Sequence, residues 1–522
     1  MRKVLLFFII IGIVVGIIIG ARAPQTKEEN LEHSSGDIEN TNVNLSKISL
    51  ALPEIDTLNP LRTNNSYLAD ILKLVYEPLV SFDEKNQIEP SLALNWAQRD
   101  DLTWIIKLRE NVSFHAGEKF TANDVKYTIE KILNGKITSK YLANVANIAK
   151  VDIIDEDTLS ISLNSKDPYF PSKLTFPIIP EYYFKNDGIM DEEKANRPIG
   201  TGSYQYSSSD ENMIELTFNK NWWKSNSARL ETIQLKKYST YNEAIKAFKS
   251  SDIDMIFTTI YNWKEKFGFI GVNSYMFESS EYETIIPNTT KESLSEHSVR
   301  MAIMSAINRE NIVANVYKGN AFIADTPIAL NSLYAIMNTE YDTEKAKQLL
   351  INAGWIQAKN GWSKNGKTLA YTLIVQKEDA EKVSIANQIK QDLAEIQIKI
   401  TINELTQTAF NERIKNGNFD LALATLDIKN EYQIQDIVST GNQYNYARYS
   451  DEKMDAIINL MRNSEGDVYA SNMETFRQHF RSEMPYIGLC YKANIILTNK
   501  SIKGEYQGTD FNPYRNIRNF CK

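Results

Sequence analysis

Cysteine is scarce in this chain of 522 residues, which contains only Cys490 and Cys521. Two cysteines near the C-terminus cannot form a disulfide framework or a cysteine-based metal site, although one late disulfide stays open. Histidine is nearly as rare, because the four histidines are scattered and none has the H-x-x-x-H spacing of a metal-binding helix. The sequence therefore predicts no metal site, and nothing in it indicates a cofactor.

Basic residues are outnumbered as well. The chain has 58 lysines and arginines against 66 acidic residues, which gives a formal net charge of −8. No basic patch interleaved with aromatic residues is visible, so nucleic acid is not an expected partner. A G-x-S-x-G nucleophile elbow is missing, and the carboxylates are too numerous for spacing alone to identify a catalytic pair. These absences favour a binding protein over an enzyme.

A nucleotide site is also not expected, although residues 361–368 match the literal phosphate-loop pattern. A true phosphate loop follows a buried strand and opens a helix, whereas here a helical pattern precedes the match and an alternating strand pattern follows it. Asn360-Gly361 and Asn365-Gly366 are turn dipeptides. This segment therefore predicts a β-hairpin.

The chain is rich in apolar, periodic sequence, with 43% hydrophobic and 11% aromatic residues. Its length predicts roughly two to four folding units. Residues 159–163 and 214–218 alternate between apolar and polar side chains, which is typical of half-buried strands. Residues 368–426 read as strand, helix, strand, helix, strand, an order that forms a parallel sheet with helices on its faces. The pattern predicts a mixed α/β protein.

Two helices are marked by residues at their ends. Thr121 and Asp124 form a capping box before a helical stripe of apolar residues. Another helix begins at Asp342 and stops at Gly354, where glycine tolerates the left-handed conformation of a helix C-terminus.

The N-terminus has the pattern of an export signal. Basic residues at positions 2 and 3 precede the uncharged apolar run from Val4 to Ala21. As a helix this run is about 27 Å long, close to the hydrocarbon thickness of a bilayer. Pro24 would occupy the first position after a signal-peptidase cut and is expected to hinder cleavage. No cysteine follows the run, so a lipoprotein anchor is excluded by residue type.

These features predict an uncleaved membrane anchor at residues 1–23, with the rest of the chain on the extracytoplasmic face of the cell membrane. Residues 24–47 are rich in Glu, Asn, Ser and Thr and predict a flexible tether.

Beyond the tether, a series of unusual strings follows in a fixed order. The strings are Leu58-Asn59-Pro60, Tyr76-Glu77-Pro78-Leu79-Val80, the residues Pro90, Leu92, Ala93 and Trp96, a dense block from Leu108 to Thr128, the loop Pro198, Gly200, Thr201, Gly202 and Tyr204, the step Asn221-Trp222-Trp223, and two helical landmarks from Val299 to Glu310 and from Tyr341 to Gly354. Their order resembles the extracellular solute-binding proteins of family 5, which bind oligopeptides or dipeptides for ABC importers. Ser203 departs from the family pattern, which has proline there.

The resemblance implies a type II periplasmic-binding-protein fold, in which two α/β lobes close on a ligand by hinge motion. Lobe I would be discontinuous, comprising residues 48–262, with a subdomain at about 80–180, and a C-terminal return at 479–522. Lobe II would comprise residues 263–478. The implied ligand is a peptide or peptide-like solute, and the implied partner is an ABC permease.

The resemblance also implies ligand-binding residues at strand ends between the lobes. They are Leu58, Asn59, Thr201, Gly202, Tyr204, Leu426, Asp427 and Lys429. In peptide-binding members a Trp-Gly-x-Asp string supplies an aspartate for the amino terminus of the ligand. Here Leu426 takes the place of the tryptophan, Lys429 falls near that of the aspartate, and Asp427 is the nearest acid.

This replacement leaves the charge of the ligand open. If Lys429 points into the cleft, peptides with a free amino terminus should bind poorly and anionic or capped ligands better, because an unpaired buried charge is costly. If Asp427 points inward, ordinary peptides stay acceptable.

Three hypotheses follow. The leading one is a membrane-tethered solute-binding protein that delivers a peptide-like ligand to an ABC permease. The second is a degenerate receptor for a non-peptide ligand, or one that serves signalling instead of uptake. The third is an extracellular hydrolase, which is disfavoured because no nucleophile and base can be paired.

Overall fold

The computed structural model describes residues 46–53, 55–186, 188–268, 270–330, 332, 340–359, 361–464 and 466–522. The anchor predicted at residues 1–23, and the tether as far as residue 45, lie outside the described residues. Within the described ranges, no helix is long and apolar enough to cross a membrane.

A large mixed sheet forms the centre of the protein. Its strands follow the order β18-β17-β19-β12-β20-β11-β1-β10-β9-β8, and β13 also pairs with β20. The strands are β1 (Ser46–Pro53), β8 (Tyr204–Ser209), β9 (Met213–Phe218), β10 (Leu230–Tyr238), β11 (Met255–Thr258), β12 (Val272–Pro287), β13 (Ala321–Ile323), β17 (Ala370–Gln376), β18 (Lys399–Leu405), β19 (Leu421–Asp427) and β20 (Ile487–Asn499).

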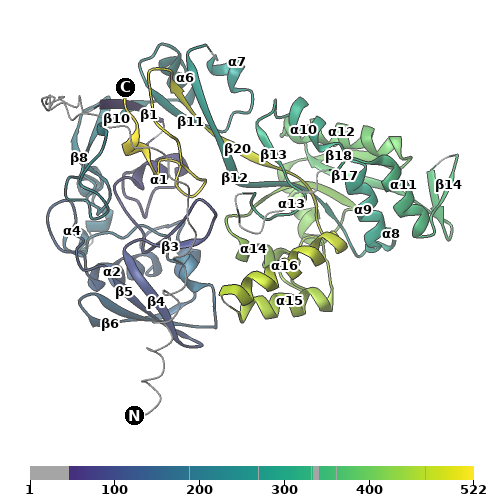
Figure 1. Cartoon of the computed structure of the whole chain (residues 1–522), viewed down its shortest axis with the longest axis horizontal. Coiled ribbons are helices and arrows are strands. Elements are labelled where there is room, and N and C mark those ends of the chain that lie inside the picture. The colour runs from purple at the N-terminus through teal and green to yellow at the C-terminus, as the bar shows by residue number, and fades with distance from the viewer. Residues whose placement is uncertain are drawn as a thin grey trace, which may run out of the picture. The chain divides into compact units, whose positions relative to one another are not determined.

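Two lobes are built on this sheet and lie side by side in Figure 1. Lobe I contains β1, β8 to β11, seven helices among the described residues, a hairpin and a four-stranded antiparallel sheet of order β4-β5-β7-β6. These elements are α1 (Ser66–Leu72), β2 (Val80–Phe82), β3 (Ile88–Pro90), β4 (Ala93–Asp100), β5 (Thr103–Leu108), α2 (Ala122–Leu133), α3 (Leu142–Val145), β6 (Ile148–Asp155), β7 (Thr158–Leu163), α4 (Glu181–Phe184), α5 (Glu192–Ala195), α6 (Tyr241–Lys249) and α7 (Trp263–Phe267), with 3₁₀ turns η1 (Phe170–Lys173), η2 (Gly188–Met190) and η3 (Ile517–Asn519).

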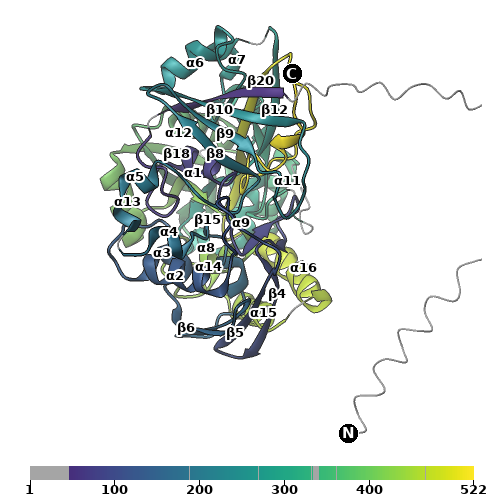
Figure 2. The same ribbon diagram turned by 90° about the vertical axis from the view of Figure 1, so that its left-hand side faces the viewer.

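Lobe II contains β13 and β17 to β19, covered by helices on both faces. Its other elements are α8 (Glu292–Ser295), α9 (His297–Ser305), α10 (Arg309–Asn315), α11 (Thr343–Asn352), β14 (Ile356–Ala358), β15 (Gly361–Lys364), β16 (Lys367–Thr368), α12 (Ala380–Glu395), α13 (Gln407–Asn416), α14 (Glu431–Val438), α15 (Glu452–Arg462) and α16 (Gly466–Glu483). Figures 1 and 2 both place α6 and α7 at one end of the folded part and β4 to β6 with α15 and α16 at the other.

Several local predictions are confirmed. The predicted order in residues 368–426 appears as β17, α12, β18, α13 and β19, and β17 pairs in parallel with both β18 and β19. The capping box at Thr121 is present at the start of α2. Asp342 caps α11, and Gly354 follows that helix with φ of +83°. The phosphate-loop match folds as the antiparallel strands β15 and β16, with β14 pairing on the other side of β15, so it opens no helix.

The lobes are joined by the two long antiparallel strands β12 and β20. The first half of β12 pairs with the second half of β20 in lobe I, and the second half of β12 pairs with the start of β20 in lobe II. The pairing register shifts between Glu278 and Tyr282, where the chain passes from one lobe to the other. The predicted boundaries at residues 262 and 478 fall before these two strands.

Each lobe has its own apolar core. Two buried clusters fill lobe I, and one of them extends to Phe520, which the C-terminal return contributes. Two further clusters cover the two faces of the lobe II sheet. Cys490 is buried in β20 and Cys521 is half-buried, and both are free thiols. The disulfide that the sequence left open is therefore not formed.

Candidate functional site

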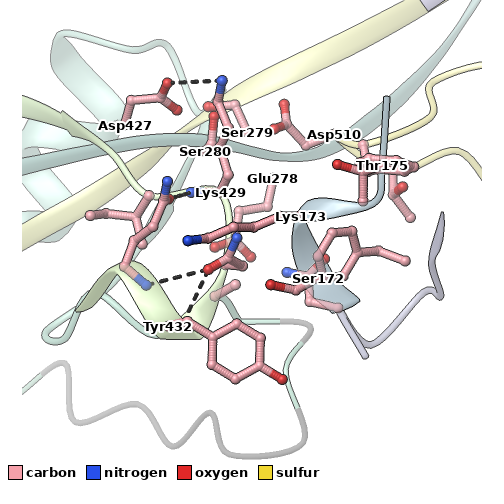
Figure 3. Close-up of a pocket in the computed structure, with 18 of the residues that line it drawn as sticks. Ser172, Lys173, Thr175, Glu278, Ser279, Ser280, Asp427, Lys429, Tyr432 and Asp510 are labelled. Carbon is pink, nitrogen blue, oxygen red and sulfur yellow. Dashed lines mark hydrogen bonds and ion pairs between the residues drawn. The ribbon is translucent and has the colours of Figure 1, made fainter. Parts of the chain in front are cut away.

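A cavity of about 1790 Å³ lies between the lobes. Lobe I supplies α1, residues 140–147 and residues 165–175, and lobe II supplies residues 427–436 and Arg462. The floor comes from residues 276–281 of β12 and from residues 506–511 of the C-terminal return. In Figure 3 Asp427, Lys429 and Tyr432 of lobe II face Ser172, Lys173 and Thr175 of lobe I. The cavity is therefore an interlobe cleft in which a ligand can contact both lobes.

Aromatic rings and charges of both signs line the cavity. The rings belong to Tyr67, Phe82, Tyr141, Tyr169, Phe257, Phe277, Phe322, Tyr432, Tyr506 and Phe511. The charged residues are Asp70, Glu84, Asp167, Glu278, Glu281, Asp427, Asp436, Asp510, Lys73, Lys140, Lys166, Lys173, Lys429 and Arg462. Such a lining suits a solute with apolar side groups and several polar groups.

The floor of the cavity is held by side chains at the register shift of β12. The Ser279 hydroxyl donates to the carbonyl oxygen of Lys492 at 2.9 Å and accepts from the backbone N–H of Glu281 at 3.2 Å. The Glu278 carboxylate accepts from the backbone N–H of Leu330 at 2.8 Å. Hydrogen bonds within the bulge therefore fix the point where the chain crosses between the lobes.

The lobes also touch across the cavity through tyrosines. Tyr169 of lobe I stacks on Tyr432 of lobe II, with ring centroids 4.0 Å apart and planes at 24°. Tyr469 meets Tyr169 edge-on at 6.1 Å. The side-chain amide of Gln435 donates to the Tyr169 hydroxyl at 3.2 Å. These four side chains, which we call the tyrosine clasp, tie residues 165–175 to α14 and α16.

Two of the predicted binding residues line the cavity. Asp427 ends β19 and Lys429 precedes α14, and their carboxylate and ammonium groups are 3.3 Å apart. Both side chains are more than half exposed, at 57% and 65%. The ammonium and the carboxylate neutralise each other in solvent, so neither presents an uncompensated buried charge. The sequence predicted that either Lys429 or Asp427 faces the cleft, and both residues belong to this one ion pair.

Three other predicted residues, Leu58, Asn59 and Leu426, are not among the residues that line the cavity. Leu58 is buried in the lobe I core. The Asn59 side chain is fully buried and donates to the carbonyl oxygen of Ile189 at 3.1 Å. Leu426 lies next to Asp427 on β19, and because alternate strand residues point to opposite faces, it packs against the lobe II core.

The loop with Thr201, Gly202 and Tyr204 is likewise structural. Thr201 donates to the buried carboxylate of Glu77 at 2.9 Å, and Tyr204 donates to the carbonyl oxygen of Leu230 at 2.8 Å. Gly202 donates its N–H to Val75 at 2.8 Å. The loop is close-packed against the backbone of residues 74–75, which leaves no room for a ligand, so these residues do not line the cavity either.

Glu77 explains why several strings of the family pattern occur together. Its carboxylate accepts hydrogen bonds from the indole N–H groups of Trp222 and Trp223, at 3.2 and 2.8 Å, as well as from Thr201. One buried acid therefore binds three separate segments of lobe I to one another. These strings of the pattern therefore form part of the framework of lobe I.

Sequence reasoning missed most of the cavity lining. Residues 140–147, 165–175 and 506–511 come from connecting segments without apolar periodicity, and they meet only in the folded chain. The sequence around Tyr169 did not predict its place in the cavity, because its stacking partner Tyr432 is far away in the sequence.

The described residues contain no group of three or more His, Cys, Asp and Glu side chains placed to hold a metal ion. The residues that line the cavity include neither histidine nor cysteine. Direct coordination of a soft metal ion by this lining would therefore lack its preferred ligands.

Two curated relatives match nearly the whole chain. The oligopeptide-binding protein AppA of Bacillus subtilis is 25% identical over 496 residues, which cover 90% of each chain. The nickel-binding periplasmic protein of Escherichia coli is 26% identical over 485 residues, which cover 87% of this chain and 91% of the relative.

The fold is shared with solved structures. The periplasmic murein tripeptide-binding protein MppA, in an unliganded open form, superimposes with a TM-score of 0.79 at 18% identity, covering 92% of this chain and 97% of that one. The two-lobed α/β fold predicted from the sequence is thus confirmed.

The family model of the bacterial extracellular solute-binding proteins, family 5, matches residues 87–440. This match spans most of the chain and includes Thr201, Trp222 and Trp223, the residues that bind the Glu77 carboxylate. The relatives are substrate-binding proteins, in agreement with the prediction of a protein that is not an enzyme. The chain belongs to the family 5 extracellular solute-binding proteins of ABC importers.

Proposed function

We propose that this protein captures oligopeptides or similar peptide-like solutes in the interlobe cavity and delivers them to the permease of an ABC importer. The observation that carries this proposal is the size of the cavity, about 1790 Å³. Sites for single small molecules usually measure roughly 300–1,000 Å³. A metal ion or a small chelate would fill only a fraction of the space, whereas a peptide of several residues would occupy it.

The composition of the lining supports the same ligand class. Aromatic rings accept varied side chains, and charges of both signs accept polar groups along an extended chain. A relative that binds oligopeptides and a structural neighbour that binds a murein tripeptide agree with this proposal. The nickel-binding relative is why a non-peptide ligand, or a receptor that signals instead of transporting, stays the alternative.

Peptide titration tests this function. The full chain is titrated calorimetrically at pH 7 with pools of synthetic peptides of two to nine residues, and separately with nickel chelated by histidine. We expect one peptide per protein and no heat from the nickel chelate. Binding of the nickel chelate alone would contradict the proposal and support the alternative.

A pair of matched variants locates the binding. Ala143 is exposed and lines the cavity, whereas Ala358 is exposed on β14 and does not. Ala143→Trp should weaken peptide binding roughly tenfold, about 1.4 kcal/mol, by filling space at the lobe I wall. Ala358→Trp should bind like the wild type. Equal affinity in the two variants would place the ligand elsewhere.

We also propose that the protein acts at the extracytoplasmic face of the cell membrane, held by an uncleaved segment at residues 1–23. The support is the sequence alone: the apolar run from Val4 to Ala21 and Pro24 at the cleavage position. Cell fractionation with N-terminal sequencing tests it. We expect intact protein in the membrane fraction, and chains that begin near Pro24 in the medium would contradict the anchor.

A further inference from the structure

Ion pairs neutralise most of the charged side chains around the cavity. The pairs are Asp70–Lys73 at 2.8 Å, Lys166–Asp101 at 3.1 Å, Asp167–Lys173 at 2.6 Å, Glu281–Lys492 at 3.2 Å, Asp427–Lys429 at 3.3 Å and Asp436–Arg462 at 3.8 Å. Glu278 accepts from the backbone N–H of Leu330, while Glu84 and Lys140 are exposed to solvent. Asp510 is the remaining acidic residue of the cavity lining.

Asp510 is bound only by neutral donors. Its carboxylate accepts from the side-chain amide of Asn494 at 2.6 Å and interacts with the hydroxyl of Ser280. No lysine or arginine of the described residues lies within ion-pair distance of it. Lys73 acts on Asp510 electrostatically, but its ammonium group is held by Asp70 and by the carbonyl oxygen of Phe511.

We propose that Asp510 is the anchor for a cationic group of the solute, an ammonium or a guanidinium. This inference rests on the proposed function and names the chemistry of its ligand. Asp510 stands on the cavity floor beside Ser279 and Ser280, at the crossing of the lobes, as Figure 3 shows. A solute held there touches the segment about which the lobes move.

Electrostatics favours Asp510 over Asp427 for this role. Asp427 is more than half exposed and already paired with Lys429, so an added cation would gain little from it. Asp510 is half-buried, and burial together with the negative charge of Asp70 raises the pKa of its carboxyl group to about 6. A cation in contact with the Asp510 carboxylate would offset the free-energy cost of burying its charge, because the attraction between opposite charges is stronger where water is excluded.

Aromatic rings on the same floor would add to the binding of a cation. Tyr506 precedes Asp510 on the return segment, and the ring centroid of Phe277 lies 5.5 Å from that of Tyr506. The Phe511 ring already has the Lys73 ammonium over it at 4.8 Å. Cations are attracted to such ring faces, most strongly where water is excluded. The carboxylate and the rings together form a floor suited to a positively charged group.

The test compares peptide pools at pH 7 by calorimetry with the full chain. One pool has free amino termini and no Lys, Arg or His, the second is its N-acetylated counterpart, and the third is acetylated but contains Lys and Arg. We expect a pool with a cation to bind at least tenfold more tightly than the uncharged pool. Asp510→Asn, which keeps an acceptor for Asn494, should remove that preference.

Glu505→Gln is the matched control, because Glu505 is an exposed acid of the same return segment that does not line the cavity. It should change affinity by less than about threefold. Equal binding of charged and uncharged pools, or a preference that survives in Asp510→Asn, would overturn the inference and leave peptide binding intact. If no pool binds, the proposed function fails, and the inference fails with it.

Proton release gives a readout that a merely structural role would not change. At pH 6 a cation that pairs with Asp510 should displace the proton from the fraction of carboxyl groups that carry one. Calorimetry in two buffers of different ionisation enthalpy should therefore show protons released by the wild type and fewer by Asp510→Asn. The facing charges, Asp70 and Lys73, are unchanged in both proteins. Equal release would contradict the assignment.

Discussion

His115 is a single residue whose protonation state follows from its hydrogen bonds. Its Nδ1 accepts from the backbone N–H of Gly200 at 3.2 Å, so its Nε2 carries the hydrogen and donates to the carbonyl oxygen of Gly202 at 3.0 Å. Burial lowers the pKa of the ring to about 4. The neutral ring thus joins the segment before α2 to the close-packed glycine loop.

The lowered pKa of His115 makes the stability of the folded protein depend on pH. The pKa of histidine in an unfolded chain is about 6.5, so between pH 6.5 and about 4 the unfolded state binds more protons than the folded state. The contribution of His115 to stability is therefore complete above pH 6.5 and declines as the pH falls. Scanning calorimetry of the wild type and His115→Gln from pH 4.5 to 7.5 checks this.

The melting temperature of the wild type should fall faster on acidification than that of His115→Gln. The difference between the two proteins is the informative quantity, because burial raises the pKa of Glu431 to about 7 and that carboxyl group acts with the opposite sign. Parallel curves for the two proteins would mean that His115 is not held neutral.

The glycine loop is an element that the sequence predicts as a ligand contact and that packs closely against residues 74–75 in the structure. A Cβ atom added at Gly202 would lie 2.4 Å from the carbonyl oxygen of Leu74, which is backbone and cannot swing away. Gly202→Ala should therefore destabilise the protein by about 1–3 kcal/mol. Because Gly202 does not line the cavity, the folded variant should still bind peptide with the affinity of the wild type.

Gly188→Ala is the matched control for this loop. Its added Cβ would meet the Nζ of Lys194 at 2.9 Å, the movable end of a long side chain. The free energy of unfolding should change by less than about 0.5 kcal/mol. A Gly202→Ala protein of normal stability that has lost peptide binding would restore the ligand role first expected of this loop.

Elements that depend on neighbouring residues could be predicted from the sequence. The caps of α2 and α11 and the parallel unit β17 to β19 follow from spacing and turn residues within a few positions. The cavity could not be predicted in this way, since contacts such as Tyr169 with Tyr432 join distant segments. Of the predicted binding residues, Asp427 and Lys429 line the cavity, because they lie at the end of β19 and just after it, where the family pattern located a strand.

At the scale of the whole molecule, the tyrosine clasp should bias the lobes toward contact. Stacked and edge-on rings contribute about 0.5–1.5 kcal/mol beyond their buried area. Tyr169→Ala removes the stack with Tyr432 and the hydrogen bond from Gln435. The ligand-free lobes should then separate more, and peptide affinity should fall several-fold because closing gains less.

Small-angle X-ray scattering of ligand-free protein measures this separation. The radius of gyration of Tyr169→Ala should exceed that of the wild type, and saturating peptide should reduce it. Tyr444→Ala is the control, because that tyrosine is 49% exposed and does not line the cavity. An unchanged radius in Tyr169→Ala would show that the clasp does not hold the lobes.

The central claim is that the interlobe cavity holds a peptide-sized solute. Native mass spectrometry of the full chain, purified without refolding, tests it most directly. We predict a species heavier than the bare chain by the mass of one peptide, which disappears after unfolding and refolding and returns on incubation with a peptide pool. A chain that carries no adduct as purified and gains none from the pool would contradict the account.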